Sequence, residues 1–260
     1  MRVPRHIVDA RRERLRTLVR QDGFLPISEV CRRLGVSEAT ARRDLEAIAA
    51  EGHISRTYGG ALADYNTSFA SLGERARRAR GGKALIARRA LREVPRTGVI
   101  FLDAGTTVLG LARLLTRRRD QALTVVTNSV AVASVLGGAP GITLHLLGGV
   151  FLHRQATLFG EHAVSALTTW TLDASFLGGE AMDAEAIWNS HPDVIRLQQT
   201  AATRARAAYF LLDATKIGRS TPHVVVGWRE VGHLVTDASP GALADAGIVL
   251  PRPRLLFAGS

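Results

Sequence analysis

The chain has 260 residues, of which 46% are hydrophobic and 22% charged, a composition that supports buried cores and favours about two domains. Its single cysteine excludes a disulfide framework, and no His or Cys spacing indicates a metal site, so we expect no metal and no cofactor. The first residues lack the apolar stretch of a secretory signal. We therefore expect a cytosolic protein of bacterial type.

One segment is long and apolar enough to raise the question of membrane insertion. Residues 121–153 contain no Asp, Glu, Lys or Arg, and such a length could cross a bilayer. The polar residues 127–129 and the Gly-rich residues 137–141 divide it into apolar runs that are too short. We expect strands and a helix of a buried parallel sheet here, and no membrane partner.

Positive charge is concentrated in one part of the chain. The formal net charge is +11, and residues 75–119 alone hold 13 basic and 2 acidic side chains. Such an excess favours polyanion partners, because neutralised phosphates supply the sequence-independent part of nucleic-acid affinity. The alternative is a basic face that is merely solvated.

Residues 1–62 have the pattern of a helix-turn-helix module. Three helices are expected, over residues 6–22, 28–34 and 38–51. Ser28 and Ser37 are placed to cap the second and third helices, and Gly35 can end the second in a left-handed conformation. Two short helices joined by a tight turn with glycine are typical of DNA-binding modules.

The third helix has the two faces that a recognition helix needs. At 100° per residue, Ala41, Leu45 and Ile48 form one apolar stripe for the core. The opposite arc carries small and basic side chains, namely Ala39, Arg42 and Arg43 with Thr40 at its edge. Small residues allow close approach to the groove, and arginines bind phosphates or guanine edges.

A short β-wing is expected after the third helix, because residues 52–60 alternate polar and apolar side chains before two glycines. We expect this winged helix-turn-helix domain to bind double-stranded operator DNA. The candidate DNA contacts are Ser28, Ser37, Ala39, Thr40, Arg42, Arg43 and Arg56. The alternative is a three-helix module that binds protein and keeps its arginines on a solvated face.

The module resembles a known family. Residues 34–45, LGVSEATARRDL, followed by Glu51-Gly52, Arg56 and Gly59-Gly60-Ala61, resemble the N-terminal domain of the DeoR family of bacterial transcription regulators. The resemblance covers residues 12–61 almost without gaps. It implies sequence-specific DNA binding. One departure is Ala41, where the family usually has isoleucine.

The rest of the chain is predicted to be a linker over residues 63–82, an α/β domain over 83–250 and a tail over 251–260. Strands are expected near residues 98–103, 123–127, 142–147, 173–177 and 208–212. Helices are expected near residues 83–94, 107–116, 129–136, 161–169 and 193–207. Strands that alternate with helices imply a mostly parallel sheet with right-handed crossovers.

Polar residues and glycines follow each predicted strand, at the edge where open α/β sheets bind ligands. The candidate effector-binding residues are Asp103, Gly105, Thr106, Thr107, Asn128, Ser129, Gly148, Gly149 and Lys216. Thr106 opens a helix whose amides favour an anion, Lys216 would add a cation, and Asp103 or Asp213 could accept sugar hydroxyls. Taken singly, these residues fit turns, helix caps and a surface lysine equally well.

Residues 75–238 resemble the DeoR-family effector domain, which is similar in fold to ribose-phosphate isomerase and glucosamine-phosphate deaminase. The matching residues are Lys83, Asp103-x-Gly105-Thr106-Thr107, Thr127-Asn128-Ser129, Gly148-Gly149, Phe159-Gly160, Asp213-x-x-Lys216 and Thr236-Asp237. The resemblance implies a phosphorylated sugar or similar metabolite that alters DNA binding. Where the family has Gly-hydrophobic-Thr and later a lysine, this chain has Ala186-Ile187-Trp188 and Gln198.

Three functions remain open on the sequence. The first is a ligand-responsive regulator, expected to repress a carbohydrate operon and to act as a homodimer or homotetramer held by its C-terminal domain. The second is a sugar-phosphate isomerase or deaminase fused to a DNA-binding domain, although no acidic pair has a spacing that guarantees convergence on a substrate. The third is an architectural DNA binder with no effector. We expect no catalytic residues.

Overall fold

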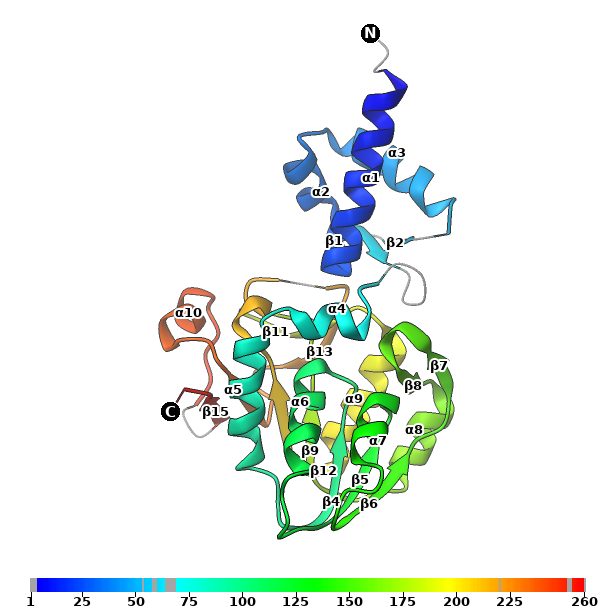
Figure 1. The fold of residues 1–260 in the computed structure, drawn as a ribbon. Helices are drawn as coiled ribbons and strands as arrows, with labels where there is room; N and C mark the ends of the chain where they lie inside the picture. Colours follow the sequence, from blue (N-terminus) through cyan, green and yellow to red (C-terminus); the bar gives the residue numbers. More distant parts are fainter. Residues whose placement is uncertain are drawn as a thin grey trace. The chain divides into compact units, whose positions relative to one another are not determined.

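The structure, a computed structural model, describes residues 4–52, 54–57, 60–63, 69–219, 221–251 and 254–259. The chain divides into two compact units, Met1–Ser71 and Leu72–Ser260 (Figure 1). The first is a winged helix-turn-helix and the second is an α/β unit, so the predicted fold class is confirmed.

The first unit contains three helices and a small sheet. Its elements are α1 (Arg5–Asp22), β1 (Phe24–Pro26), α2 (Ile27–Leu34), α3 (Glu38–Ala49), β2 (Ile54–Thr57) and β3 (Gly60–Ala63). Strand β3 lies between β1 and β2 and is antiparallel to both, so the predicted wing is present and β1 extends it. Leu15 and Val19 of α1 are buried, whereas Ile7 is 46% exposed.

Two of the three expected local signals in this unit are confirmed. Gly35 ends α2 with φ +65°, which is the left-handed conformation expected there. The Ser37 hydroxyl accepts a hydrogen bond from the Thr40 amide at 3.4 Å and so caps α3. The cap assigned to Ser28 is wrong, because α2 already begins at Ile27 after Pro26, whose fixed φ favours a helix start without a side-chain cap.

The second unit is built on a seven-stranded parallel sheet with the order β15-β14-β12-β9-β4-β5-β6. These strands are β4 (Thr97–Leu102), β5 (Ala122–Thr127), β6 (Ile142–Leu146), β9 (Leu172–Leu177), β12 (Ala205–Leu211), β14 (His233–Thr236) and β15 (Leu255–Phe257). Five of them lie within a few residues of the predicted strands. The unpredicted β15 lies in the segment expected to be a tail, where pairing with β14 orders it.

Helices cover both faces of this sheet (Figure 1). They are α4 (Leu72–Arg77), α5 (Arg80–Leu91), α6 (Thr106–Leu115), α7 (Val130–Leu136), α8 (Glu161–Thr168), α9 (Pro192–Arg204) and α10 (Pro240–Asp245). Helices α5, α6 and α7 enclose one apolar core with the sheet, and α8, α9 and α10 enclose the other. Burial on both faces explains the nearly continuous apolar strands in the sequence.

The segment expected to be a linker is partly folded. Helix α4 and the first turn of α5 occupy residues 72–82 and belong to the second unit. Leu72 packs against the core beside α5 and α6. The arginines of this segment hide its helical periodicity, so the sequence pattern did not reveal α4 or the first turn of α5, whose remainder matches the helix expected near residues 83–94.

The strand order places a topological switch point between β4 and β9. The chain runs outward from β4 through β5 to β6 on one side, and from β9 through β12 to β14 and β15 on the other. The loops that follow β4 and β9 therefore leave in opposite directions at the carboxyl edge of the sheet, which is the place where open α/β sheets bind ligands.

Short antiparallel strands lie beyond the main sheet. The hairpin of β7 (Val150–Leu152) and β8 (Thr157–Phe159) follows β6, with the short η1 (His153–Gln155) in between. A second small sheet has the order β10-β11-β13, from Ala181–Met182, Ala186–Asn189 and His223–Gly227. The short η2 (Ala214–Lys216) follows β12.

Candidate DNA-binding surface and ligand site

The outward face of α3 carries the side chains expected of a recognition helix. The predicted core stripe is buried, at Ala41, Leu45 and Ile48. The opposite face is exposed at Ala39, Arg42 and Arg43, with Thr40 half-buried beside it. Arg42 donates from Nε to Glu38 Oε1 at 2.9 Å, whereas Arg43 forms no ion pair with any described residue. Arg43 is therefore the more available cation.

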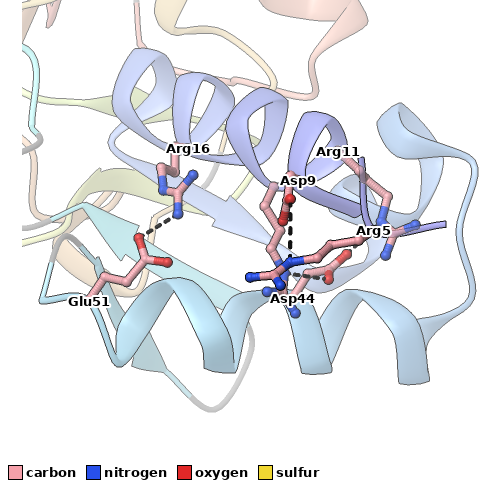
Figure 2. A network of polar contacts seen from close by, with 7 residues as sticks. Arg5, Asp9, Arg11, Arg16, Asp44 and Glu51 are labelled. Atoms are coloured by element: carbon pink, nitrogen blue, oxygen red, sulfur yellow. Dashed lines mark hydrogen bonds and ion pairs between the residues drawn. The ribbon is translucent and has the colours of Figure 1, made fainter. Parts of the chain in front are cut away.

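A polar network that the sequence did not reveal holds α3 against α1 (Figure 2). The Asp44 carboxylate is 2% exposed and accepts from Arg11 Nε at 2.6 Å and from Arg12 Nε at 3.0 Å. Arg16 of α1 also pairs with Glu51, just beyond α3. These arginines act within the module, and they fix the helix that presents Arg43.

The remaining candidate contacts lie in two other elements. Ser28 is exposed in the first turn of α2. Arg56 lies in β2 opposite Ala61 of β3, and its side chain is outside the described part of the structure.

At the switch point, the loops after β4 and β9 touch. Gly105 precedes α6, and a Cβ atom at Gly105 would lie 3.5 Å from Gly178 Cα, so two glycines permit this approach. The Asp103 carboxylate is 4% exposed, and its Oδ2 accepts from the Gly178 amide at 3.0 Å. Thr106 is half-buried and Thr107 is buried in the first turn of α6. The amides of that turn therefore lie at the switch point.

Asp103 is fully engaged within the protein. Besides the Gly178 amide, its Oδ2 accepts from Gln198 Nε2 at 2.7 Å, and its Oδ1 accepts from the Ala104 amide at 2.7 Å. Gln198 is 2% exposed and also donates to Gly178 O at 3.1 Å. Asp103 thus links the loops after β4 and β9. It is therefore less suited to accept sugar hydroxyls than expected. Asp213 likewise accepts from the Thr215 amide at 3.1 Å.

The loop after β5, the strand next to β4, is buried at Asn128 and Ser129. Asn128 donates from Nδ2 to Thr157 Oγ1 of β8 at 2.9 Å, while its Oδ1 is buried and accepts no hydrogen bond from a described residue. The Ser129 hydroxyl caps α7 by accepting from the Val132 amide at 3.1 Å. Asn128 therefore offers a free acceptor, and Ser129 has a structural role.

The glycine pair after β6 leads into the β7–β8 hairpin, and Gly149 lies against Phe159 of β8. Gly149 has φ +134°, and a Cβ atom there would lie 2.3 Å from Phe159 O. Only glycine fits that conformation so close to a neighbouring strand. Gly148 is exposed with open space around it.

A cluster of cations gathers near the carboxyl ends of β9 and β12. Burial lowers the pKa of Lys216 to about 8; Asp213 and Glu180 oppose this shift, and Lys83 and Arg75 add to it. Burial also lowers the pKa of Lys83, whose Nζ donates to Arg75 O at 2.7 Å. Burial and mutual repulsion both disfavour the charged forms of these side chains. An anion bound beside them would stabilise those charged forms.

Two members of this cation cluster were not among the predicted effector residues. Lys83 of α5 was noted only in the family resemblance, and Arg75 of α4 lies in the segment expected to be a linker. Arg75 donates to the buried Gln155 Oε1 of η1, 80 residues away in sequence. No local pattern could reveal a contact of that separation.

Two residues that depart from the family pattern lie on α9 and β11, and the one on α9, Gln198, contacts Asp103. Gln198 accepts at Oε1 from Asn189 Nδ2 at 3.3 Å, which ties α9 to β11. Trp188, in β11, is half-buried, and its Nε1 is buried with no partner among the described residues. Gln198 therefore places a neutral amide where the family has a lysine, and Trp188 places an indole N–H donor where the family has a threonine.

The described residues contain no candidate metal site and no candidate membrane span. No group of three or more His, Cys, Asp or Glu side chains in this part of the chain could hold a metal ion. None of the described helices is long and apolar enough to span a bilayer.

Comparisons with known proteins agree with these two units. A DeoR-like helix-turn-helix domain matches residues 11–67, and a DeoR C-terminal sensor domain matches residues 78–238. A putative aga operon transcriptional repressor of Escherichia coli O157:H7 is 28% identical over 87% of this chain and 85% of its own. The lactose phosphotransferase system repressor of Lactococcus lactis subsp. lactis is 30% identical over 87% of this chain and 90% of its own.

Among solved structures, a ribose 5-phosphate isomerase A from Methanocaldococcus jannaschii aligns over 52% of each chain, with 16% identity and a TM-score of 0.37. The two family models together cover most of the sequence, in the order in which the two units occur. The chain belongs to the DeoR family of transcriptional regulators.

Proposed function

We propose that this regulator represses a carbohydrate-metabolism operon and that a phosphorylated sugar, bound at the carboxyl edge of the parallel sheet, modulates its hold on DNA. The observation that carries the proposal is the cation cluster of Arg75, Lys83 and Lys216 at the ligand-binding edge of an open α/β sheet. The similar repressor from Lactococcus lactis is named for a lactose phosphotransferase system, which fits a phosphorylated effector.

The phosphate group is the part of the ligand that the site recognises best. The amides at the N-terminus of α6 and the three cations both favour a dianion. Asn128 Oδ1 and Trp188 Nε1 are a buried acceptor and a buried donor left for sugar hydroxyls. Trp188 is bulky, so the sugar end favours a small or flat substituent.

The position of the cations in the sequence suggests how binding reaches the DNA-binding unit. Arg75 and Lys83 lie on α4 and α5, the first two helices after the boundary at Ser71. A phosphate held by these side chains would fix the segment that leads directly to the wing. Ordering of this segment would change how freely the DNA-binding unit moves.

At the DNA, the proposed contacts are Ser28, Ser37, Ala39, Thr40, Arg42, Arg43 and Arg56. One such module reads too few base pairs for a specific operator, and helix-turn-helix proteins bind paired half-sites as dimers. The proposed state is therefore a homodimer or homotetramer.

Substitution of Thr106 tests the ligand site. Ribose 5-phosphate, glucose 6-phosphate and glucosamine 6-phosphate are compared with their unphosphorylated forms by thermal unfolding and by operator gel shift. At least one phosphorylated sugar should raise the melting temperature and change operator affinity, and the unphosphorylated forms should do neither. Thr106→Asp places a carboxylate at the anion position and should abolish the response while DNA binding remains.

Thr168→Asp is the matched control, since it adds the same charge at an exposed position of α8. If Thr106→Asp responds like the wild type, the phosphate site lies elsewhere.

The alternative is catalysis on a sugar phosphate. Isomerisation needs a carboxylate free to move a proton at C2. Asp103 accepts hydrogen bonds at both carboxylate oxygens, and Asp213 accepts two from Thr215 at Oδ1, so both carboxylates already have structural roles in their own loops. We propose that the sensor unit binds without turnover; conversion of ribose 5-phosphate above a protein-free blank would revive the alternative.

A further inference from the structure

Asp237 follows β14 at the carboxyl edge of the sheet and contacts the turn that carries Lys216. Its place in the chain is fixed by Thr236, which is fully buried and accepts the Ala238 amide at Oγ1, at 3.1 Å. The Oδ1 atom of Asp237 accepts from the Ala214 amide at 2.8 Å. Ala214 begins η2, which ends at Lys216. One carboxylate oxygen therefore holds the lysine turn against the end of β14.

The rest of the Asp237 carboxylate lies against α5. A Cβ atom at Gly82, in the first turn of that helix, would stand 2.7 Å from Asp237 Cγ and closer still to Oδ2, so only glycine permits this approach. Helix α5 follows Ala79, whose side chain cannot cap it, and its first turn contains no acidic residue. The first amides of a helix lack partners within it, and the helix dipole favours a carboxylate beside them. Asp237 supplies that negative charge from a distant part of the sequence.

Asp237 thus joins the two segments that carry the two lysines of the cation cluster. Lys83 directly follows Gly82, and Lys216 lies in η2. We propose that Asp237 is a positioning residue of the ligand site, whose carboxylate sets the spacing between Lys83 and Lys216 by holding η2 and the first turn of α5 together. The inference rests on the proposed function only for the statement that these lysines bind a phosphate.

The charges of the cluster explain why its spacing has to be held. The ammonium of Lys83 lowers the pKa of Lys216, so the two groups repel each other before any anion is bound. A contact that keeps their segments together in the free protein leaves less ordering for the ligand to impose, and such preorganisation raises affinity. Asp237 acts through η2 and α5 and does not need to touch the ligand.

Gly82→Ala and Gly81→Ala are a matched pair of variants. Both add a methyl group in the first turn of α5, but a Cβ atom at Gly81 has no atom within 4 Å, whereas one at Gly82 displaces the Asp237 carboxylate. The full chain is titrated with ribose 5-phosphate, glucose 6-phosphate and glucosamine 6-phosphate by calorimetry. Gly82→Ala should weaken the binding seen with the wild type by about tenfold or more. Gly81→Ala should bind like the wild type.

A second readout needs no ligand. The chain has only two lysines, so protein labelled with ¹³C and ¹⁵N at lysine gives separate side-chain signals for Lys83 and Lys216. Burial lowers the pKa of Lys216 to about 8. Displacement of η2 exposes this ammonium, so Gly82→Ala should raise its pKa toward the ordinary value of a lysine, and Gly81→Ala should leave it unchanged. Equal pKa values of Lys216 in the two variants overturn the inference, whether or not a sugar phosphate binds. A wild type that binds none of the three sugar phosphates contradicts the proposed function alone.

Substitutions of Asp237 show whether Gly82 acts through it. Asp237→Ala should weaken binding as Gly82→Ala does, and Gly82→Ala should add little once the carboxylate is gone. Asp237→Asn keeps an acceptor for the Ala214 amide and should restore part of the affinity. Asp245→Ala, at an exposed position of α10, is the control for lost charge. Additive losses in the double variant, or wild-type affinity of Asp237→Ala, overturn the proposal. If Asp237→Ala fails to fold, the two glycine variants decide the case.

Discussion

At the residue scale, the proposed effector site is expected to depend on pH through Lys216. Its pKa is lowered to about 8, mainly by burial, so the ammonium is charged at pH 7 and loses its proton as the pH rises through 8. A sugar phosphate is already a dianion above pH 7, so its own charge does not change in that range. A bound dianion favours the protonated form of Lys216. Above pH 8 the ligand-free site therefore holds fewer protons than the occupied site.

The affinity for the best sugar phosphate should therefore fall between pH 7 and pH 9.5, approaching about tenfold per pH unit above pH 8. Isothermal titration calorimetry across this range measures the slope. Lys216→Gln should bind more weakly at pH 7 and show a shallower slope, with Lys83 left to titrate. A wild-type affinity that does not change with pH would remove Lys216 from the site.

The contacts of single residues show which features the sequence could not predict. Asp103 could be singled out because it follows a predicted strand, but its partners Gly178 and Gln198 are 75 and 95 residues away. Its role as a link between two loops depends on strand order, which periodicity does not determine. Arg75 was missed for the same reason, since its contact with Gln155 spans the fold.

At the element scale, α3 is the helix most directly open to test. The 100° spacing of helical residues predicted that Arg42 and Arg43 point outward, and both are exposed. Arg43→Ala should weaken operator binding by about 1–3 kcal/mol if the guanidinium makes a bidentate base contact. Arg42→Ala should cost less, because its guanidinium is already shared with Glu38. Gel shifts on the DNA upstream of its own gene measure both.

Arg14→Ala serves as the control for lost charge, since Arg14 is exposed on α1. Equal affinity of Arg43→Ala and the wild type would exclude α3 from the groove.

Long elements were predicted well and short ones were not. The strands β4, β5 and β9 are buried on both faces and appear in the sequence as apolar runs between turn residues. Strands β10 and β11 span only Ala181–Met182 and Ala186–Asn189, too short to show a period. Their positions come from pairing with each other and with β13, which local patterns do not encode.

At the scale of the whole molecule, the question is whether the two units communicate. The surface of α3 and the basic charge are compatible with both a ligand-responsive regulator and an architectural DNA binder. They differ in whether a ligand on the sensor unit changes the free energy of DNA binding. Arg75 and Lys83 lie next in sequence to the DNA-binding unit, which favours communication.

Linkage makes this difference measurable from both sides. If the sugar phosphate lowers operator affinity by a given factor, the operator must lower sugar-phosphate affinity by the same factor. We expect a coupling of about 1–3 kcal/mol, or roughly 5–150-fold in each dissociation constant. Fluorescence anisotropy of labelled operator gives one factor, and calorimetric titration of the protein with and without operator gives the other. An architectural binder would show the same operator dissociation constant with and without the sugar phosphate. Because the reciprocal test needs no reporter gene, it separates direct coupling between the units from any indirect effect of sugar metabolism on transcription.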